Sequence, residues 1–362
     1  MAAAGASALA APAAAQAPAV PPACAFPVFQ FPADAIPRVD GKGDDWEMVG
    51  PAYRVGNESL AADDGSGVRP DPVSLDVSVR VGWVKGLNRL YFLYEARDDV
   101  WDFAASGIRS DLFELVVDGD RSGGPFIARF RPDRTISEED SWFGFQNIHA
   151  QNYHIFTPPG DKDWAMAWGP QAGWIKRLPY SNVAYRHDLK PGQPGRLVME
   201  MWITPFDHAD ARGPAHSIES VLAENKPIGM AWAVIDYDGA RTARHRFWNL
   251  SPHHNMFGQA SELCRFTPMP LETGLAPAIK ADWSFEITDR AQRIVAFRDA
   301  TTGAATRWEW DFGDGATSTE QHPVHRYATA GKFVVILRVT GPGGSSKLAK
   351  VWDVSFVGDP QK

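Results

Sequence analysis

The chain has 362 residues, of which 44% are apolar and 22% are charged, as is typical of globular domains with an apolar core. Its formal net charge is −8 at pH 7, which disfavours a nucleic-acid partner because binding to phosphates needs a basic face. No stretch contains the roughly 18 consecutive apolar residues of a membrane-spanning helix, so the sequence predicts no membrane span.

The first segment, residues 1–25, is dominated by Ala and Pro. Its run at 13–17 resembles the small-residue end of a secretory signal peptide, although no basic region precedes it. We therefore expect either the remnant of a signal peptide or a disordered linker. The predicted location is secreted, periplasmic or at the cell surface.

The two cysteines, Cys24 and Cys264, bracket the larger predicted domain. A disulfide between them would join the two ends of that domain, and it would suit an oxidising compartment. Two unrelated free thiols are the alternative.

Strand patterns dominate residues 26–267. Between Leu75 and Trp83, apolar residues alternate with polar ones, a period of two that is typical of a strand with one buried face. Further strands are predicted at 90–94, 112–117, 197–203 and 228–234. Many short strands separated by turn residues favour a β-sandwich. The one expected helix is short, at 217–224.

The same region carries short motifs in a fixed order. They are the turn Ile36 to Gly41 followed by Asp-Asp-Trp at 44–46, an L-Y-F strand at 90–92, an acidic pair at 98–99, and the segments 110–118, 199–206 and 228–238. In this order they resemble family 9 carbohydrate-binding modules. The resemblance implies a large jelly-roll-like β-sandwich whose partner is a polysaccharide or an oligosaccharide.

A long insertion, residues 132–195, distinguishes this chain from those modules, and it is rich in aromatic residues. Sugar rings present flat C–H faces on which Trp and Tyr stack, while polar neighbours bond the hydroxyl groups. The predicted carbohydrate-binding residues are Trp142, His149, Asn152, Tyr153, His154, Trp164, Trp168 and Trp174. The alternative is that these rings form a local hydrophobic core that holds the insertion against the sandwich.

Acidic residues in predicted turns indicate a calcium site. Asp98, Asp118 and Asp120 flank strands, and oxygen-rich turns bind calcium. Calcium sites are common in the resembled family, so the resemblance implies a structural Ca²⁺; solvated turn carboxylates are the alternative. The chain has neither an H-E-x-x-H nor a C-x-x-C spacing, so no other cofactor is expected.

A linker rich in Pro and Gly, residues 268–282, leads to a second domain at 283–357. Its turn W-E-W-D-F-G-D-G at 308–315 is followed by a proline, an aromatic residue and a glycine, and then by an alternating strand at 333–339. This pattern strongly resembles PKD domains. The resemblance implies a small immunoglobulin-like β-sandwich that serves as a spacer or as a polysaccharide or protein contact.

These features together predict an all-β, secreted polysaccharide-binding protein that acts in polysaccharide recognition or breakdown. The first alternative is a carboxylate-based glycoside hydrolase or polysaccharide lyase, with Glu200, Asp236 and Asp238 as candidate catalytic acids. The chain has no nucleophile elbow, phosphate loop or dinucleotide motif, which disfavours several other enzyme classes. The second alternative is an adhesion or scaffolding protein in a cell-surface or extracellular assembly.

Overall fold

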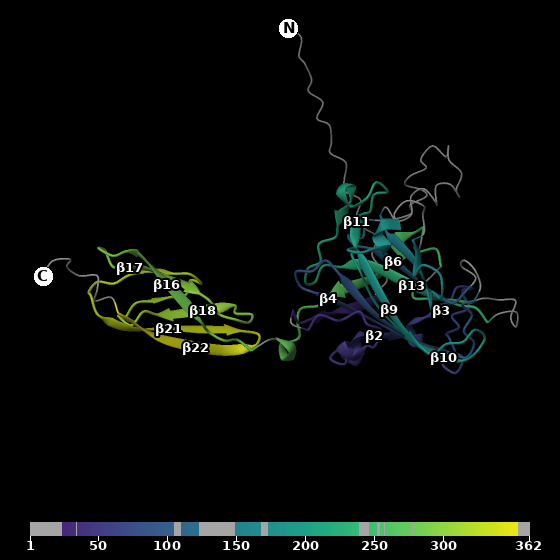
Figure 1. Ribbon diagram of the computed structural model, residues 1–362, viewed down its shortest axis with the longest axis horizontal. Coiled ribbons are helices and arrows are strands. Elements are labelled where there is room, and N and C mark those ends of the chain that lie inside the picture. The colour runs from purple at the N-terminus through teal and green to yellow at the C-terminus, as the bar shows by residue number, and fades with distance from the viewer. Residues whose placement is uncertain are drawn as a thin grey trace, which may run out of the picture. The chain divides into compact units, whose positions relative to one another are not determined.

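The computed structural model describes residues 24–33, 35–104, 110–122, 149–167, 173–238, 246–251, 254–256, 258–276 and 278–353. The chain divides into two compact units, Met1–Pro270 and Leu271–Lys362. The described residues form strands and short 3-10 helices without an α-helix (Figure 1), which confirms the all-β prediction. None of these helices is long and apolar enough to cross a bilayer.

The larger unit is one continuous sheet of thirteen strands that folds into two layers. The first layer, sheet I, runs in the order β8 (Ala165–Ala167), β7 (Gln151–Phe156), β6 (Leu112–Asp118), β13 (Ile228–Asp236), β15 (Cys264–Pro268) and β1 (Ala25–Phe31). At its margin β14 (Arg246–Asn249) pairs with β13 and with β3 (Ala61–Ala62). The second layer, sheet II, runs in the order β1, β4 (Leu75–Val84), β5 (Leu90–Asp98), β10 (Gly195–Ile203) and β9 (Ser181–His187), with β2 (Arg54–Gly56) paired to β4.

Strand β1 joins the two layers. Its residues Ala25–Val28 pair in parallel with β15 of sheet I, and Phe29–Phe31 pair in parallel with β4 of sheet II. The disulfide Cys24–Cys264 lies at the start of the first pairing, with Cα atoms 4.9 Å apart. The first and last strands of the unit are therefore held together by backbone hydrogen bonds and by a covalent bond.

The core lies between the two layers and follows from the alternation in the sequence. Val77, Val79 and Val81 of β4 point inward and are buried, as the period of two predicts. Across the core, Tyr94 of β5 packs on Phe113 of β6, with ring centroids 4.8 Å apart. The residues between these inward positions lie on the outer faces of the sheets.

Two features of the larger unit differ from the sequence interpretation. The segment 217–224 is not a helix, since Ile218–Glu219 is strand β12 paired with β11 (Phe206–His208); eight residues are too few for a helix that little packing supports. No strand is predicted in the insertion 132–195, yet it supplies β7 and β8 to sheet I and β9 to sheet II. Among its aromatic residues, Tyr153 lies on β7 and Tyr185 on β9, whereas Trp164 precedes β8.

Short 3-10 helices connect the strands. They are η1 (Asp44–Trp46), η2 (Pro51–Tyr53), η3 (Asn57–Ser59), η4 (Gly173–Lys176), η5 (Pro214–His216), η7 (Ala260–Glu262) and η8 (Thr273–Leu275).

The smaller unit is a sandwich of two sheets. One sheet has the order β16 (Trp283–Asp289), β17 (Ile294–Asp299) and β20 (Val324–Arg326), and the other has the order β19 (Thr317–Ser318), β18 (Arg307–Asp311), β21 (Lys332–Gly341) and β22 (Gly344–Asp353). Trp283, Phe297 and Trp310 meet in its core. Gly313 has a φ of +81°, and a Cβ at this position would lie 2.7 Å from the backbone oxygen of Val334. The turn therefore requires glycine.

Candidate functional site

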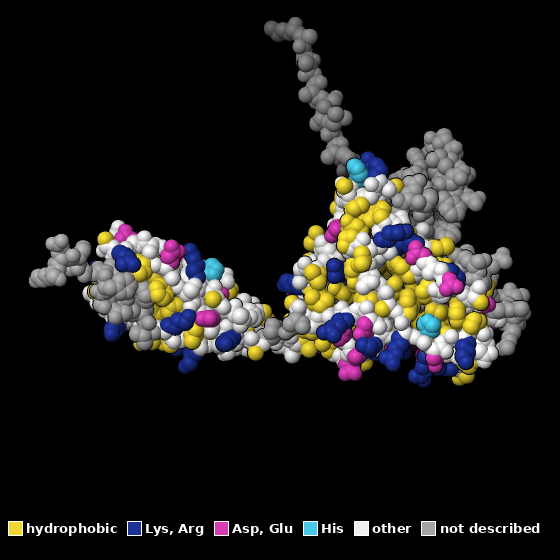
Figure 2. Space-filling view, viewed as in Figure 1, with side chains coloured by type: hydrophobic (Ala, Val, Ile, Leu, Met, Phe, Trp, Pro, Cys, Tyr) yellow, Lys and Arg dark blue, Asp and Glu magenta, His cyan; other side chains and the backbone are white. Residues whose placement is uncertain are grey.

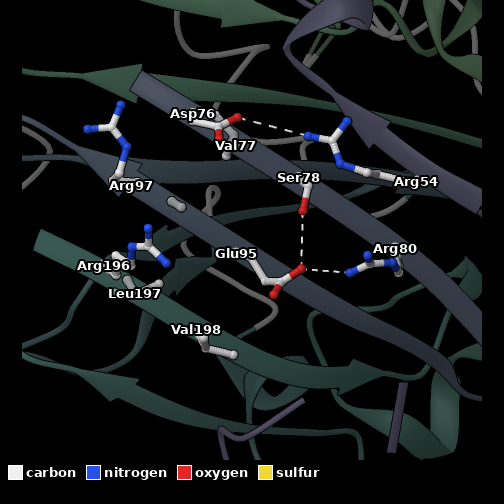
Figure 3. A pocket seen from close by; sticks show the side chains of 11 residues that line it. Arg54, Asp76, Val77, Ser78, Arg80, Glu95, Arg97, Arg196, Leu197 and Val198 are labelled. Carbon is white, nitrogen blue, oxygen red and sulfur yellow. Dashed lines mark hydrogen bonds and ion pairs between the residues drawn. The ribbon is translucent and has the colours of Figure 1, made fainter. Parts of the chain in front are cut away.

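An open groove with a volume of about 340 Å³ lies over sheet II (Figure 3). The side chains that form it point away from the core on β4, β5 and β10, and one comes from β2. They are Arg54, Asp76, Ser78, Arg80, Glu95, Arg97, Arg196 and Val198. The strand register places them in rows across the sheet: Asp76, Arg97 and Arg196 form one row, and Ser78, Glu95 and Val198 form the next. The groove is therefore formed by the residues at the outward-facing positions of these alternating strands.

Neighbouring side chains hold one another in place in the groove. The Glu95 carboxylate accepts hydrogen bonds from Arg80 Nη1 at 2.6 Å and from Ser78 Oγ at 3.2 Å. Arg54 lies 3.9 Å from Asp76. These contacts fix donors and acceptors before any ligand arrives, and such preorganisation favours binding.

Glu200, a predicted catalytic candidate, also lies on the outer face of sheet II but bonds to its own chain. Its Oε2 accepts the backbone N–H groups of residues 40, 41 and 42 at 3.1, 2.7 and 3.1 Å, and its Oε1 accepts Trp46 Nε1 at 3.1 Å. Gly41 has a φ of +80°, and a Cβ there would lie 2.8 Å from the backbone carbon of Tyr185. Burial raises the pKa of Glu200, while these hydrogen bonds oppose the shift. The arrangement anchors the Asp-Gly turn on the sheet.

Three buried aspartates meet at one end of the sandwich. Asp98 ends β5, Asp111 precedes β6 and Asp236 ends β13, and one carboxylate oxygen of each lies within 4.8 Å of the others. Asp98 forms a second such group with Asp99 and Asp238. Burial and then the charge of Asp236 raise the pKa of Asp98 to about 8. Burial and then the charge of Asp98 raise the pKa of Asp111 well above its usual range.

This aspartate cluster fits a hard divalent cation. Several carboxylate oxygens within reach of one point are the ligands that Ca²⁺ prefers, and a cation would remove the mutual repulsion that raises the two pKa values. Asp98 was expected at a calcium site, and it lies in this cluster. Asp118 and Asp120 do not join it, because Asp118 is at the opposite end of β6 from Asp111, roughly 20 Å away along the strand. Asp120 bonds the backbone N–H of Ser122 at 2.9 Å instead.

The three candidate catalytic acids do not face one cleft. Glu200 lies on the outer face of sheet II, whereas Asp236 lies in the aspartate cluster at the end of sheet I. Asp238 belongs to the group of Asp98 and Asp99. Glycoside hydrolysis requires two carboxylates across one substrate, and Glu200 lies apart from both aspartates, which share Asp98 as a neighbour.

The described rings of the insertion pack against the sandwich. Tyr153 is fully buried in the core and stacks on Trp164 at 6.1 Å. Trp174 contacts the rings of Tyr180 and Phe206 at 4.9 and 5.1 Å and donates from Nε1 to the backbone oxygen of Asp210 at 3.0 Å. These contacts correspond to the local-core alternative. Trp142 and Trp168 lie outside the described residues.

The polar residues predicted in the insertion lie elsewhere on the unit. Asn152 and His154 of β7 are on the outer face of sheet I beside Glu114, which is buried: Asn152 Nδ2 donates to it at 3.1 Å and His154 Nε2 lies at 3.7 Å. His254 Nε2 hydrogen-bonds the other Glu114 oxygen at 2.7 Å. Burial would raise the pKa of Glu114, but His154 and His254 outweigh it and the pKa is lowered. His149 lies apart, with its ring 5.6 Å from that of His208.

Sequence reasoning missed most of the groove and part of both clusters. The groove residues look like ordinary exposed positions of alternating strands, and their one signal was the presence of several arginines at outward positions. Asp111 lies within the motif at 110–118, and His254 carries no local signal of a site. In each case partners far apart in sequence come together through strand pairing.

Residues 275–355 match the family model of the PKD domain, so the C-terminal PKD prediction is confirmed. The PKD1 domain of Vibrio anguillarum Epp is similar to this part, with 27% identity, 22% of this chain and 94% of that chain covered, and a TM-score of 0.20. Over the larger unit, a family 9 carbohydrate-binding module from Caldicellulosiruptor kristjanssonii in complex with cellotriose is 14% identical. That match covers 70% of this chain and 98% of that chain, with a TM-score of 0.42. A putative carbohydrate-binding protein from Bacteroides uniformis is 11% identical, covering 67% and 98% with a TM-score of 0.38.

Proposed function

We propose that the larger unit binds carbohydrate in the groove over sheet II, and that the protein acts in polysaccharide recognition or breakdown. The observation that carries this proposal is the open, polar groove in which Ser78, Arg80 and Glu95 hold one another in place. Its volume of about 340 Å³ falls within the range of small-ligand sites. Guanidinium, hydroxyl and carboxylate groups together can donate to and accept from sugar hydroxyls.

This proposal moves the binding site away from the predicted aromatic insertion. The described rings of the insertion are wholly or partly buried against the core, so they offer little surface for stacking. The groove instead offers a charged and polar floor, and hydrogen bonds would supply most of the recognition.

We also propose that Ca²⁺ is a structural cofactor, held by Asp98, Asp111 and Asp236. The ion would neutralise the three carboxylates and so fix the ends of β5 and β13 beside the start of β6.

The disulfide Cys24–Cys264 supports a location in an oxidising compartment, which agrees with a secreted or periplasmic protein.

A blocking variant tests the site. Val198 lies in the groove on β10, so Val198→Trp should fill the groove and abolish retention on polysaccharides. The control is Asn182→Trp, which adds the same ring to an exposed position of β9 outside the lining. Retention should be measured by pull-down against a panel of soluble and insoluble polysaccharides, with chromatography of the supernatant.

The outcomes separate the functions. Retention that only Val198→Trp loses supports binding in the groove, and retention that survives in Val198→Trp rejects this site. Newly released oligosaccharides would indicate an enzyme. No retention on any glycan would reject carbohydrate binding and favour an adhesion or scaffolding role.

A further inference from the structure

The groove over sheet II carries an excess of positive charge. Its lining contains four arginines and two acidic residues, a formal charge of 4 − 2 = +2. Glu58 beside it pairs with Arg54 at 3.3 Å, which leaves a charge of +1, although the whole chain carries −8. Figure 2 shows Lys and Arg interspersed with Asp and Glu on its visible face. The groove is therefore opposite in sign to the chain as a whole.

Two of its arginines lie directly opposite each other. Arg97 of β5 and Arg196 of β10 are partners in the strand register, which places their Cβ atoms about 5 Å apart on one face. Like charges in this position destabilise a sheet. The acidic residue on the other side of Arg97 is Asp76, and the ion pair that it forms is with Arg54 at 3.9 Å.

Neither guanidinium of this pair is bonded to a carboxylate within the described residues. Arg97 Nη2 donates to backbone oxygens, those of Pro72 and Val73. The Arg196 side chain forms no hydrogen bond or ion pair in the described part of the chain, and its backbone N–H lies 3.3 Å from Asp188 Oδ1. In Figure 3 both side chains stand at the same end of the groove without a dashed contact to another residue drawn there.

The chemistry of arginine suits an anion at this pair. Arg80 does not share this role, because it is paired with Glu95 through Nη1 at 2.6 Å and its Nε is buried. Arginine presents several N–H groups in one plane, and this geometry matches carboxylate and sulfate groups, which accept two parallel hydrogen bonds. The groove thus combines unpaired positive charge with donors suited to an anion.

We infer that the groove takes an acidic sugar chain, whose carboxylate or sulfate group binds between Arg97 and Arg196. This inference rests on the proposed carbohydrate binding and names its substrate class. Such an anion would neutralise the paired guanidinium groups. A neutral chain would leave two like charges on neighbouring strand positions.

The test compares matched polysaccharides on the full chain. Polygalacturonate and its methyl-esterified form share one backbone and differ in their charged carboxylates. Dextran sulfate and dextran likewise share one backbone and differ in their sulfate groups. We expect tight, salt-sensitive binding to an acidic member and at least tenfold weaker binding to its neutral counterpart, measured by calorimetry. Preference for polygalacturonate would identify a carboxylate ligand and preference for dextran sulfate a sulfate ligand, and either supports the inference.

Arg196→Gln provides the residue-level test, because this side chain has no partner to lose in the described structure. Its dissociation constant for the acidic chain should rise about tenfold, so that most of the preference over the neutral chain is lost; a preference that survives in this variant would contradict the inference. Arg69→Gln removes the same charge from an exposed position outside the groove and should change neither the dissociation constant nor the preference.

Three outcomes would overturn the inference. Equal binding of the acidic and neutral chains would leave carbohydrate binding intact and remove the acidic preference. Equal binding of single-stranded DNA would show a general polyanion surface. Absence of binding to every chain in both pairs would remove the inference, and the polysaccharide panel would separately decide the proposed function.

Discussion

Removal of calcium is expected to destabilise the larger unit through the aspartate cluster. In the metal-free protein the pKa of Asp98 is about 8, against about 3.9 in an unfolded chain. The folded state therefore keeps a proton that the unfolded state has released between about pH 4 and pH 8. Its free energy of unfolding should fall as the pH rises through this window. The four-unit difference corresponds to about 5 kcal/mol at the upper limit.

Calcium should restore this stability at high pH. A ligand at a hundred times its dissociation constant adds about 2.7 kcal/mol, and 1 kcal/mol shifts the melting temperature of a unit of this size by about 2–4 °C. We therefore expect Ca²⁺ to raise the melting temperature of chelated protein by about 5–10 °C at pH 8. At pH 5 the effect should be much smaller, because the aspartates then retain protons that compete with the ion.

Scanning calorimetry with and without chelator provides the measurement, and two asparagine variants locate the site. Asp111→Asn should abolish the calcium-dependent shift, whereas Asp120→Asn should retain it. A shift that depends on Asp120 and not on Asp111 would refute the reasoning and restore the site expected from the sequence. A melting temperature that does not change with calcium at pH 8 would refute calcium binding altogether.

Four further changes probe other parts of the chain. Glu200→Ala removes the acceptor of four donors and should lower the free energy of unfolding by about 3 kcal/mol in urea titrations without changing polysaccharide retention; lost retention at unchanged stability would contradict its structural role. Cys264→Ser removes the disulfide between residues with a sequence separation of 240 and should lower the free energy of unfolding by up to about 5 kcal/mol; an unchanged midpoint in urea would contradict a stabilising role of the disulfide. Trp174→Ala should lower the melting temperature of the larger unit, with a cost of about 3 kcal/mol; a stable variant that binds no glycan would revive the aromatic platform. Gly313→Ala should destabilise only the smaller unit, by about 2 kcal/mol, and a calorimetric shift confined to the larger unit would contradict this.

Local patterns in the sequence were enough to predict the strands and the PKD turn. The alternation from Leu75 to Trp83 describes β4 because the period of two is a property of one strand. The need for glycine in the W-D-F-G-D-G turn is equally local, because it is set by the backbone angles at that position and by the nearest atoms. Such features can be predicted without knowing which strands pair.

The candidate sites could not be predicted in the same way. Asp98, Asp111 and Asp236 come from three strand ends in two layers, and only the pairing of β6 with β13 brings the last two together. The rows of the groove likewise depend on the register of β4, β5 and β10. The aromatic content of the insertion was visible, but whether a ring faces the core or solvent depends on the strand that carries it.

The position of β1 has a consequence for how the chain acquires its fold. β1 pairs with β4 and with β15, so its seven residues cannot complete their hydrogen bonds until residue 268 has been synthesised, more than 230 residues after β1 ends. At roughly 5–20 residues per second this interval lasts on the order of 10–50 s. During that time Ala25–Val28 lack their partner strand, and unpaired strand edges are the condition in which chains associate wrongly. Closure of the larger unit is therefore a late event, and its yield should depend on how well the N-terminal strand is shielded during synthesis.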